Sequence, residues 1–427
     1  MLLKLDKTEN GVKIICCTIP YLKSTNIAVW VKVGSKYEAE SMHGASHFIE
    51  HLVFTGTKKY PSRNDLVGAV ETYGGQLNAF VEREASCFWI RIPTAYSLQC
   101  VEILSDMLGN PLFEEQSIEK ERKVIIEELK KHMDDPREWV LSMLDELLWP
   151  DHPLGRYVGG RIDSIKRIQR SELLQFMHNH YRPDNMVISI VSGDLYPDLI
   201  TLLKAHFASF ISHSHYRRFT IPPIPPPIKK LCFLERQTHQ YHFALGIRAL
   251  SRTHPDRYVV ELLNIILGRG MSSRLFDALR SQGGMLYSIH THLECLEETG
   301  AFKIYGGTSS DLVSTIRLIL EVILTMQRHR ISEYELEKAK QFYKGRLILG
   351  MEDARNLAFW LGESLLLDGE YYSPNQILQR VEQVSCEDLN RVLTSLFQAE
   401  NFKLAVIGPR LDENTEEALN SLINGLA

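Results

Sequence analysis

The sequence has few features of a secreted, membrane-spanning or nucleic-acid-binding protein. Its seven cysteines are an odd number without a C-x-x-C pair, so free thiols in a reducing compartment fit better than a disulfide framework. No apolar run reaches the length of a membrane span, and residues 1–13 lack the apolar core of a signal peptide. The net charge of −5 is far from the basic balance of a general nucleic-acid binder. We therefore expect a cytoplasmic protein that neither inserts into a membrane nor binds nucleic acid.

The features that are present suit a globular protein of two domains. A chain of 427 residues exceeds what one hydrophobic core usually supports, and 44% hydrophobic with 24% charged residues is an ordinary balance. Five prolines between Pro222 and Pro227 cannot continue a helix or a central strand, so a stiff connector is expected there. We expect an N-terminal domain over 1–221, a proline-rich linker over 222–230 and a C-terminal domain over 231–427.

The two halves share an order of elements, which predicts two copies of one α+β fold. Each half opens with alternating apolar segments, continues with long helical stretches, and closes with an amphipathic helix and an apolar strand. The closing segments run from Ser171 to Gly193 and from Ser385 to Gly408. Two unrelated α+β domains can share such a pattern, which is the alternative to a repeat. The strands expected to open the halves are Val12–Pro20, Asn26–Val33, Lys230–Leu234 and Tyr241–Arg248.

One short segment carries the clearest chemical signal. The run from Ser41 to Gly56 reads as a buried helix, with Ser41 as its N-cap and Gly56 as its stop. His47 and His51 are four residues apart, so they share a helix face and can hold one metal ion between their imidazoles. Glu50 projects near this place without being needed as a ligand, which suits a general base for water. The pattern H-x-x-E-H is that of the inverzincins.

The motif also has a purely structural interpretation, in which the histidines are hydrogen-bonded and the glutamate forms a salt bridge. A chain with this histidine content contains the pattern by chance in roughly one case in twenty. Three ionisable groups in an otherwise apolar helix, however, are costly to bury without a partner such as a metal. His43 precedes His47 by one turn but lies about 12 Å from His51 along the helix axis. We therefore expect His43 at the rim of the site.

A second acidic helix is expected to complete the metal site. A catalytic zinc ion needs a third protein ligand and one open position. Glu121 and Glu128 are seven residues apart, so they lie near one helix face, which around Glu128 also holds Val124 and Ile125. Glu127 has lysines as neighbours, as on a solvated face. We assign Glu128 as the third ligand and Glu121 as a carboxylate that supports the catalytic group, with an acidic helix surface as the alternative for Glu121.

Together these motifs resemble the pitrilysin/insulinase family of zinc peptidases, which includes the mitochondrial processing peptidase. The resemblance covers nearly the whole chain and implies Zn2+ as cofactor, held by His47, His51 and Glu128. In that family the third ligand closes an E-x6-E run, as Glu128 does here. The matching stretches are HFIEHLVFTG at 47–56, GGQLNA at 74–79, ERKVIIEEL at 121–129, GRGMSSRLF at 268–276 and LRSQGGMLYS at 279–288.

The resemblance also implies residues that bind substrate. Arg280 and Tyr287 match a pair that holds substrate carbonyls beside the zinc, although by chemistry alone they are an ordinary helix-surface arginine and a strand tyrosine. Asn78 and Ala79 match the sheet edge to which family members add the substrate as a further strand. The threonine that the family usually carries near Val81 is absent.

The function implied by the resemblance is a zinc metalloendopeptidase. Two homologous α+β domains would form half of a clam-shell chamber that admits peptides or small unfolded polypeptides. The chain carries both the zinc motif and the arginine–tyrosine pair, which favours a self-sufficient homodimer. The alternatives are an active subunit that forms a heterodimer with a related inactive chain, and a non-catalytic structural subunit. The motifs do not separate a processing peptidase from an enzyme of general peptide turnover.

Overall fold

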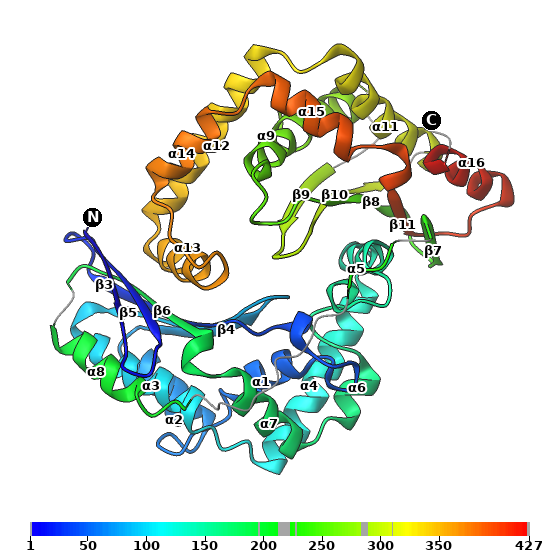
Figure 1. Ribbon diagram of the computed structural model, residues 1–427. Helices are drawn as coiled ribbons and strands as arrows, with labels where there is room; N and C mark the ends of the chain where they lie inside the picture. The colour runs from blue at the N-terminus through cyan, green and yellow to red at the C-terminus, as the bar shows by residue number, and fades with distance from the viewer. Residues whose placement is uncertain are drawn as a thin grey trace. The chain divides into compact units, whose positions relative to one another are not determined.

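The computed structural model describes two compact units, each containing helices and a mixed sheet (Figure 1), which confirms the α+β class. The first unit comprises Met1–Lys130, Tyr157–Pro222 and Leu349–Tyr371, and the second comprises Lys131–Arg156, Pro223–Ile348 and Tyr372–Ala427. None of the helices that the structure describes is both long and apolar enough to span a bilayer. The described residues are 2–194, 197–211, 223–226, 229–282, 289–309 and 311–424, without the side chains of 197, 280–282 and 399.

The first unit is built on a six-stranded sheet in the order β1-β2-β6-β3-β5-β4. Strands β2 and β6 are parallel, and the other neighbours are antiparallel. The central strand β6 is buried along its whole length, which agrees with its largely apolar sequence, MVISIVS. The strands are β1 Leu2–Lys7, β2 Lys13–Thr18, β3 Ser24–Val31, β4 Gln76–Val81, β5 Ser86–Pro93 and β6 Met186–Ser192.

Helices cover both faces of the first sheet. On one face α1, α3 and α7 form a core with the sheet, and on the other face α13, from the C-terminal half of the chain, packs on β3 and β6. Gly362 of α13 lies so close to Trp30 of β3 that a Cβ atom there would clash with the indole ring. The helices are α1 Ala45–Leu52, α2 Arg63–Glu71, α3 Ser97–Gly109, α4 Glu115–Asp134, α6 Ile162–Arg167, α7 Arg170–His180, α8 Pro197–Phe207 and α13 Ala354–Leu367.

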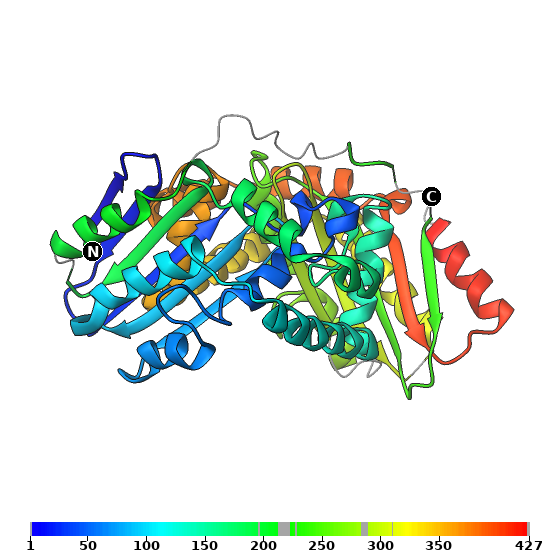
Figure 2. The same cartoon turned by 90° about the horizontal axis from the view of Figure 1, so that it is seen from below.

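The second unit repeats the strand arrangement of the first. Its order is β7-β11-β8-β10-β9, with β7 and β11 side by side and parallel (Figure 2) and the other neighbours antiparallel. The same sequence of directions occurs in β2-β6-β3-β5-β4, as expected for two copies of one fold. The strands are β7 Leu231–Glu235, β8 Tyr241–Ala249, β9 Ile289–Cys295, β10 Gly300–Thr308 and β11 Lys403–Gly408.

The second sheet also receives a helix from the other half of the chain. Helix α5 packs on β8 and β11, where Leu144 lies against Ala244 and Ala405 in one core. Each unit therefore contains one helix from the other half of the chain, α13 in the first and α5 in the second. The expected division at 222–230 did not include these two helices. The helices are α5 Pro136–Leu148, α9 Arg257–Leu267, α10 Arg274–Phe276, α11 Leu312–His329, α12 Glu333–Glu352, α14 Pro374–Glu382, α15 Cys386–Leu396 and α16 Glu413–Asn424.

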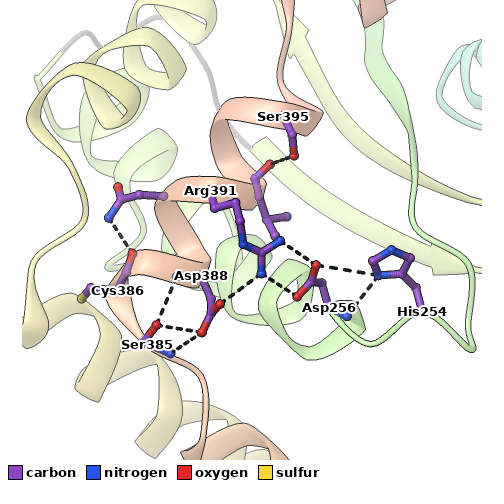
Figure 3. Close-up of polar contacts among 9 residues, drawn as sticks. His254, Asp256, Ser385, Cys386, Asp388, Arg391 and Ser395 are labelled. Atoms are coloured by element: carbon purple, nitrogen blue, oxygen red, sulfur yellow. Dashed lines mark hydrogen bonds and ion pairs between the residues drawn. The ribbon is translucent and has the colours of Figure 1, made fainter.

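Helix α15 is capped by side chains at its start, and an arginine of the same helix contacts the start of α9 (Figure 3). Ser385, the expected start, caps the helix reciprocally with Asp388. Arg391 then donates two hydrogen bonds of 2.9 Å to the carboxylate of Asp256, the N-cap of α9, and one of 3.0 Å to Asp388. The other closing helix, α7, begins at Arg170, one residue before the expected Ser171, and Oε2 of Glu172 accepts the backbone N–H of Gln169.

Candidate metal centre

The helix that carries the histidine motif is shorter than expected. It spans Ala45–Leu52 and not the full run from Ser41 to Gly56. The reason is Gly44, whose φ of 97° is incompatible with a continuous right-handed helix. A Cβ atom at this position would also lie 2.9 Å from the backbone Cα atom of Gly160, so the backbone conformation and the close approach both favour glycine here.

His43 is a buried structural residue, and its expected place at the rim of the site is wrong. It lies before the left-handed Gly44 and outside the motif helix. Its side chain is buried, and its Nε2 atom is 2.8 Å from the backbone oxygen of Tyr157. The hydroxyl of Ser164 donates a hydrogen bond of 2.6 Å to the carbonyl of His43. These contacts hold the entry to α1 in place.

The structure brings His47, Glu50 and His51 together at one side of α1. The atoms of these side chains that could bind a metal all lie within 4.8 Å of one another. Oε2 of Glu50 is 3.9 Å from Nε2 of each histidine. The two imidazole rings stand edge to face, with centroids 4.7 Å apart. The three side chains are largely but not completely buried, so the site remains open to solvent.

Helix α4 brings Glu128 to the same two histidines. Its Oε2 atom is 3.3 Å from Nε2 of His51 and 3.9 Å from Nε2 of His47. The Glu128 side chain is 49% exposed, whereas that of Glu127 is 70% exposed and forms an ion pair of 2.7 Å with Lys130. The two neighbouring glutamates therefore have different surroundings, and Glu128 is the one beside the histidines.

Glu121 lies two turns before Glu128 on α4 and contacts the other ring nitrogen of His51. Its Oε2 atom is 3.1 Å from Nδ1 of His51, and its side chain is buried. The buried side of α4 runs through Ile118, Glu121 and Ile125. Val124 was expected on the inward face together with Ile125, and this is wrong, because Val124 is 40% exposed.

Burial and neighbouring charges move the pKa values of the motif residues apart. Burial, with a contribution from the charges of Glu128 and Glu121, raises the pKa of Glu50 to about 7. Burial also lowers the pKa of His47 to about 4, and the adjacent His51 acts in the same direction. Burial alone would lower the pKa of His51. The hydrogen bond to Glu121 and the charges of the nearby carboxylates outweigh burial, so the pKa of His51 lies above its usual value. A glutamate with a pKa near 7 can both accept and return a proton at neutral pH.

The donor set fits a zinc ion. Two imidazole nitrogens and a carboxylate oxygen are ligands that zinc takes in catalytic sites. The contact between Glu121 and Nδ1 of His51 assigns the proton to Nδ1 and leaves Nε2 as a ligand atom. Nδ1 of His47 is buried with no hydrogen-bond partner among the described residues. A metal ion bound at Nε2 would orient this ring in place of such a hydrogen bond. Glu128 approaches Nε2 of His51 more closely than Glu50 does, which is the geometry expected of the third ligand.

The residues predicted to bind substrate are placed only in part. Asn78 and Ala79 lie in β4, an edge strand of the first sheet, and Oδ1 of Asn78 accepts the backbone N–H of Ala79 at 2.8 Å. Arg280 lies in the π-helical segment Asp277–Gln282, and its side chain is outside the description. Tyr287 lies outside the described residues altogether.

Glu38, which no sequence motif predicts, is directly linked to the motif helix. Its two carboxylate oxygens accept the backbone N–H groups of Gly44 and Ser46, each at 2.7 Å. Close to it in sequence, Lys36 forms a buried ion pair of 2.7 Å with Glu84. The sequence alone does not single out Glu38, because the glycine N-cap that it serves appears only in the structure.

Family profiles and related proteins match most of the chain. The family profile described as insulinase, peptidase family M16, matches residues 13–160, and that of the peptidase M16 inactive domain matches residues 167–343. A Bacillus subtilis protein named an uncharacterized zinc protease is 31% identical over 409 residues, which cover 96% of this chain and 98% of the relative. A Mycobacterium tuberculosis protein of the same description is 31% identical over 410 residues, covering 93% and 91%.

Solved structures show the same fold. The crystal structure of a protease from Helicobacter pylori has a TM-score of 0.87 at 21% identity, covering 96% of this chain and 100% of the other. The crystal structure of a peptidase M16 inactive domain from Pseudomonas fluorescens has a TM-score of 0.88 at 17% identity, covering 96% and 98%. At these identities the likeness establishes the architecture and leaves the chemistry to the residues of the site.

Proposed function

Because the chain belongs to the insulinase family of peptidases, family M16, we propose that it is a zinc metalloendopeptidase. The observation that carries this proposal is the convergence of Nε2 of His47, Nε2 of His51 and Oε2 of Glu128, with Glu50 beside them. The relatives named zinc proteases, which match almost the whole chain, support the choice of metal and of reaction.

In this proposal His47, His51 and Glu128 hold the metal and Glu50 moves the proton. A zinc ion at such a site acts as a Lewis acid toward the substrate carbonyl and toward water. Glu50 accepts a proton from the attacking water at Oε2 and transfers it to the leaving amine nitrogen, for which a pKa near 7 is suited. Glu121 keeps the proton of His51 on Nδ1, so that Nε2 retains its lone pair.

The proposed substrates are peptides or small unfolded polypeptides. The edge strand β4, with Asn78 and Ala79, offers backbone groups to which an extended peptide can pair as a further strand. Arg280 and Tyr287 are proposed to hold the substrate carbonyl and stabilise the developing oxyanion. A closed chamber formed by two chains, a homodimer or a heterodimer with a related chain, would restrict entry to unfolded substrates.

The proposal also includes a cellular location and a physiological role. The enzyme would act in the cytoplasm, a location supported by the seven free cysteines. It could process a leader segment or degrade peptides generally, and the two roles differ in how narrow the set of cleavage sites is.

The test compares the wild type with Glu50→Gln and Glu127→Gln on a peptide library, with cleavage sites mapped by mass spectrometry. We expect about one zinc per chain in all three proteins, because neither variant removes a ligand. Glu50→Gln should lose about 100-fold to 10,000-fold in kcat, the usual contribution of a general base, and Glu127→Gln should match the wild type. A zinc-free wild type, or an active Glu50→Gln variant, would contradict the proposal.

A further inference from the structure

A buried group of charges lies beside the motif helix and takes no part in the proposed chemistry. Glu38 and Lys36 are fully buried, and Glu84 nearly so. Lys36 donates a hydrogen bond of 2.7 Å to Oε1 of Glu84. Buried charges are costly unless hydrogen-bonded partners satisfy them, so their presence here needs a structural reason.

The reason for Glu38 is found at the start of α1. The first N–H groups of a helix lack partners within the helix and are usually satisfied by a side chain at the N-cap. The N-cap here is Gly44, which has no side chain to offer. Glu38 takes over this role from a distance, because Oε2 accepts the N–H of Gly44 and Oε1 accepts the N–H of Ser46, both at 2.7 Å. Charge-assisted bonds of this length are the stronger kind.

The segment that carries Glu38 is itself fixed. The backbone N–H groups of Ser35 and Lys36 donate to the carbonyls of Glu82 and Arg83, at 3.4 and 3.0 Å. A Cβ atom at Gly34 would clash with the carbonyl oxygen of Glu82, so the two backbone segments are in direct contact. The carboxylate of Glu38 therefore acts from a rigid support.

The position of these hydrogen bonds ties them to the catalytic groups. Ser46 directly precedes His47, and Glu50 lies one helical turn further along the same short helix.

We propose that Glu38 is a positioning residue, whose carboxylate fixes the first turn of α1 so that His47, Glu50 and His51 point at one metal ion. This inference rests on the proposed function, since it concerns the same site. Without both acceptor oxygens, the first turn of an eight-residue helix would be free to shift relative to α4. A displacement of this kind would separate the nitrogens of α1 from Glu128.

The experiment uses three variants of the full chain. Glu38→Gln replaces one acceptor oxygen by an amide that faces an N–H group, while Glu38→Asp keeps both oxygens on a side chain shorter by one methylene. Glu40→Gln is the matched control, because Glu40 is a 78% exposed carboxylate close by in sequence that lies 3.9 Å from Arg161. For each protein we would measure zinc affinity by chelator competition, the visible spectrum of bound Co2+, and thermal unfolding.

We expect Glu38→Gln to weaken zinc binding by about 10-fold to 100-fold, the range found when a residue that orients metal ligands is removed, and to change the Co2+ spectrum. Glu38→Asp should lose less, and Glu40→Gln nothing. A folded Glu38→Gln variant with the zinc affinity and Co2+ spectrum of the wild type would overturn the proposal. If Glu38→Gln does not fold, Glu38→Asp decides, and unchanged zinc affinity in it overturns the proposal equally. Failure of the wild type to bind zinc would instead refute the proposed function.

Discussion

Nδ1 of His51 lies 3.1 Å from Oε2 of Glu121, so this carboxylate of α4 holds the imidazole at the nitrogen that is not the proposed metal ligand. The hydrogen bond and the surrounding carboxylates raise the pKa of His51, although burial acts against them. A metal can bind Nε2 only when that nitrogen carries no proton. Metal binding by the free site is therefore linked to the release of a proton from His51.

This linkage predicts how zinc affinity depends on pH. Because the pKa of His51 in the folded, metal-free protein is raised, the imidazolium persists to a higher pH than usual. Below that pKa each zinc ion must displace one proton, so affinity should fall about tenfold for each pH unit. Chelator competition across the neutral and mildly acidic range measures this slope. In Glu121→Gln the decline should begin at lower pH, and an affinity independent of pH would contradict the assignment of His51 as a ligand.

The assignment of the third ligand predicts a contrast between two adjacent residues. Glu128→Gln should weaken zinc binding strongly, because its Oε2 atom approaches the nitrogens of both histidines. Glu127→Gln should leave zinc binding unchanged, because Glu127 forms an exposed ion pair with Lys130, and such pairs contribute little. Elemental analysis after dialysis against a weak chelator measures the difference. Zinc loss in Glu127→Gln alone would show that the wrong glutamate has been assigned.

The parts of the site that follow from helix geometry could be predicted from the sequence. His47 and His51 share a face because a helix places residues four apart on one side, and the E-x6-E spacing of Glu121 and Glu128 does the same on α4. The expected strands also occur, with ends shifted by a few residues, since alternation identifies a strand better than its termini.

The features that depend on long-range contacts could not be predicted. The pattern of α5 or α13 shows that each helix has an apolar side, but it does not say which sheet that side will cover. Glu38 was missed for a similar reason. A cap supplied from outside the helix depends on the left-handed backbone at Gly44 and on the contact of Lys36 with the Arg83 carbonyl, neither of which is a local sequence signal.

The docking of α13 predicts opposite effects for two glycine-to-alanine changes. Gly362→Ala should lower the free energy of unfolding by about 1–3 kcal/mol, because the new methyl group would clash with the ring of Trp30. Gly345→Ala on α12 should instead raise it by up to about 1 kcal/mol, because nothing lies within 4 Å and alanine favours a helix. Urea unfolding of both variants measures the two changes. An equal gain from both would mean that α13 does not pack closely on β3.

The proposed assembly predicts complementation between two inactive chains. The resemblance to the insulinase family implies a pairing of two chains in which the C-terminal domain of one would face the zinc domain of the other. Glu50→Gln has an intact Arg280 and Tyr287, whereas Arg280→Ala/Tyr287→Ala has an intact zinc domain. A mixed dimer would therefore contain one complete site if the groups act across chains. If they act within one chain, neither chain in the mixture is complete.

Random exchange of equal amounts makes half of the dimers mixed, each with one complete site out of two, so about a quarter of the wild-type activity should return. Peptide cleavage measures this recovery, and native mass spectrometry shows whether subunits have exchanged. The matched control mixes Glu50→Gln with the triple variant Glu50→Gln/Arg280→Ala/Tyr287→Ala, which exchanges in the same way but cannot form a complete site. Recovery in the first mixture and not in the control would establish action across chains. Subunit exchange without recovery of activity would refute it, because the mixed dimer would then lack a complete site. A fully active wild-type monomer would also refute it, because a single chain would then contain a complete site.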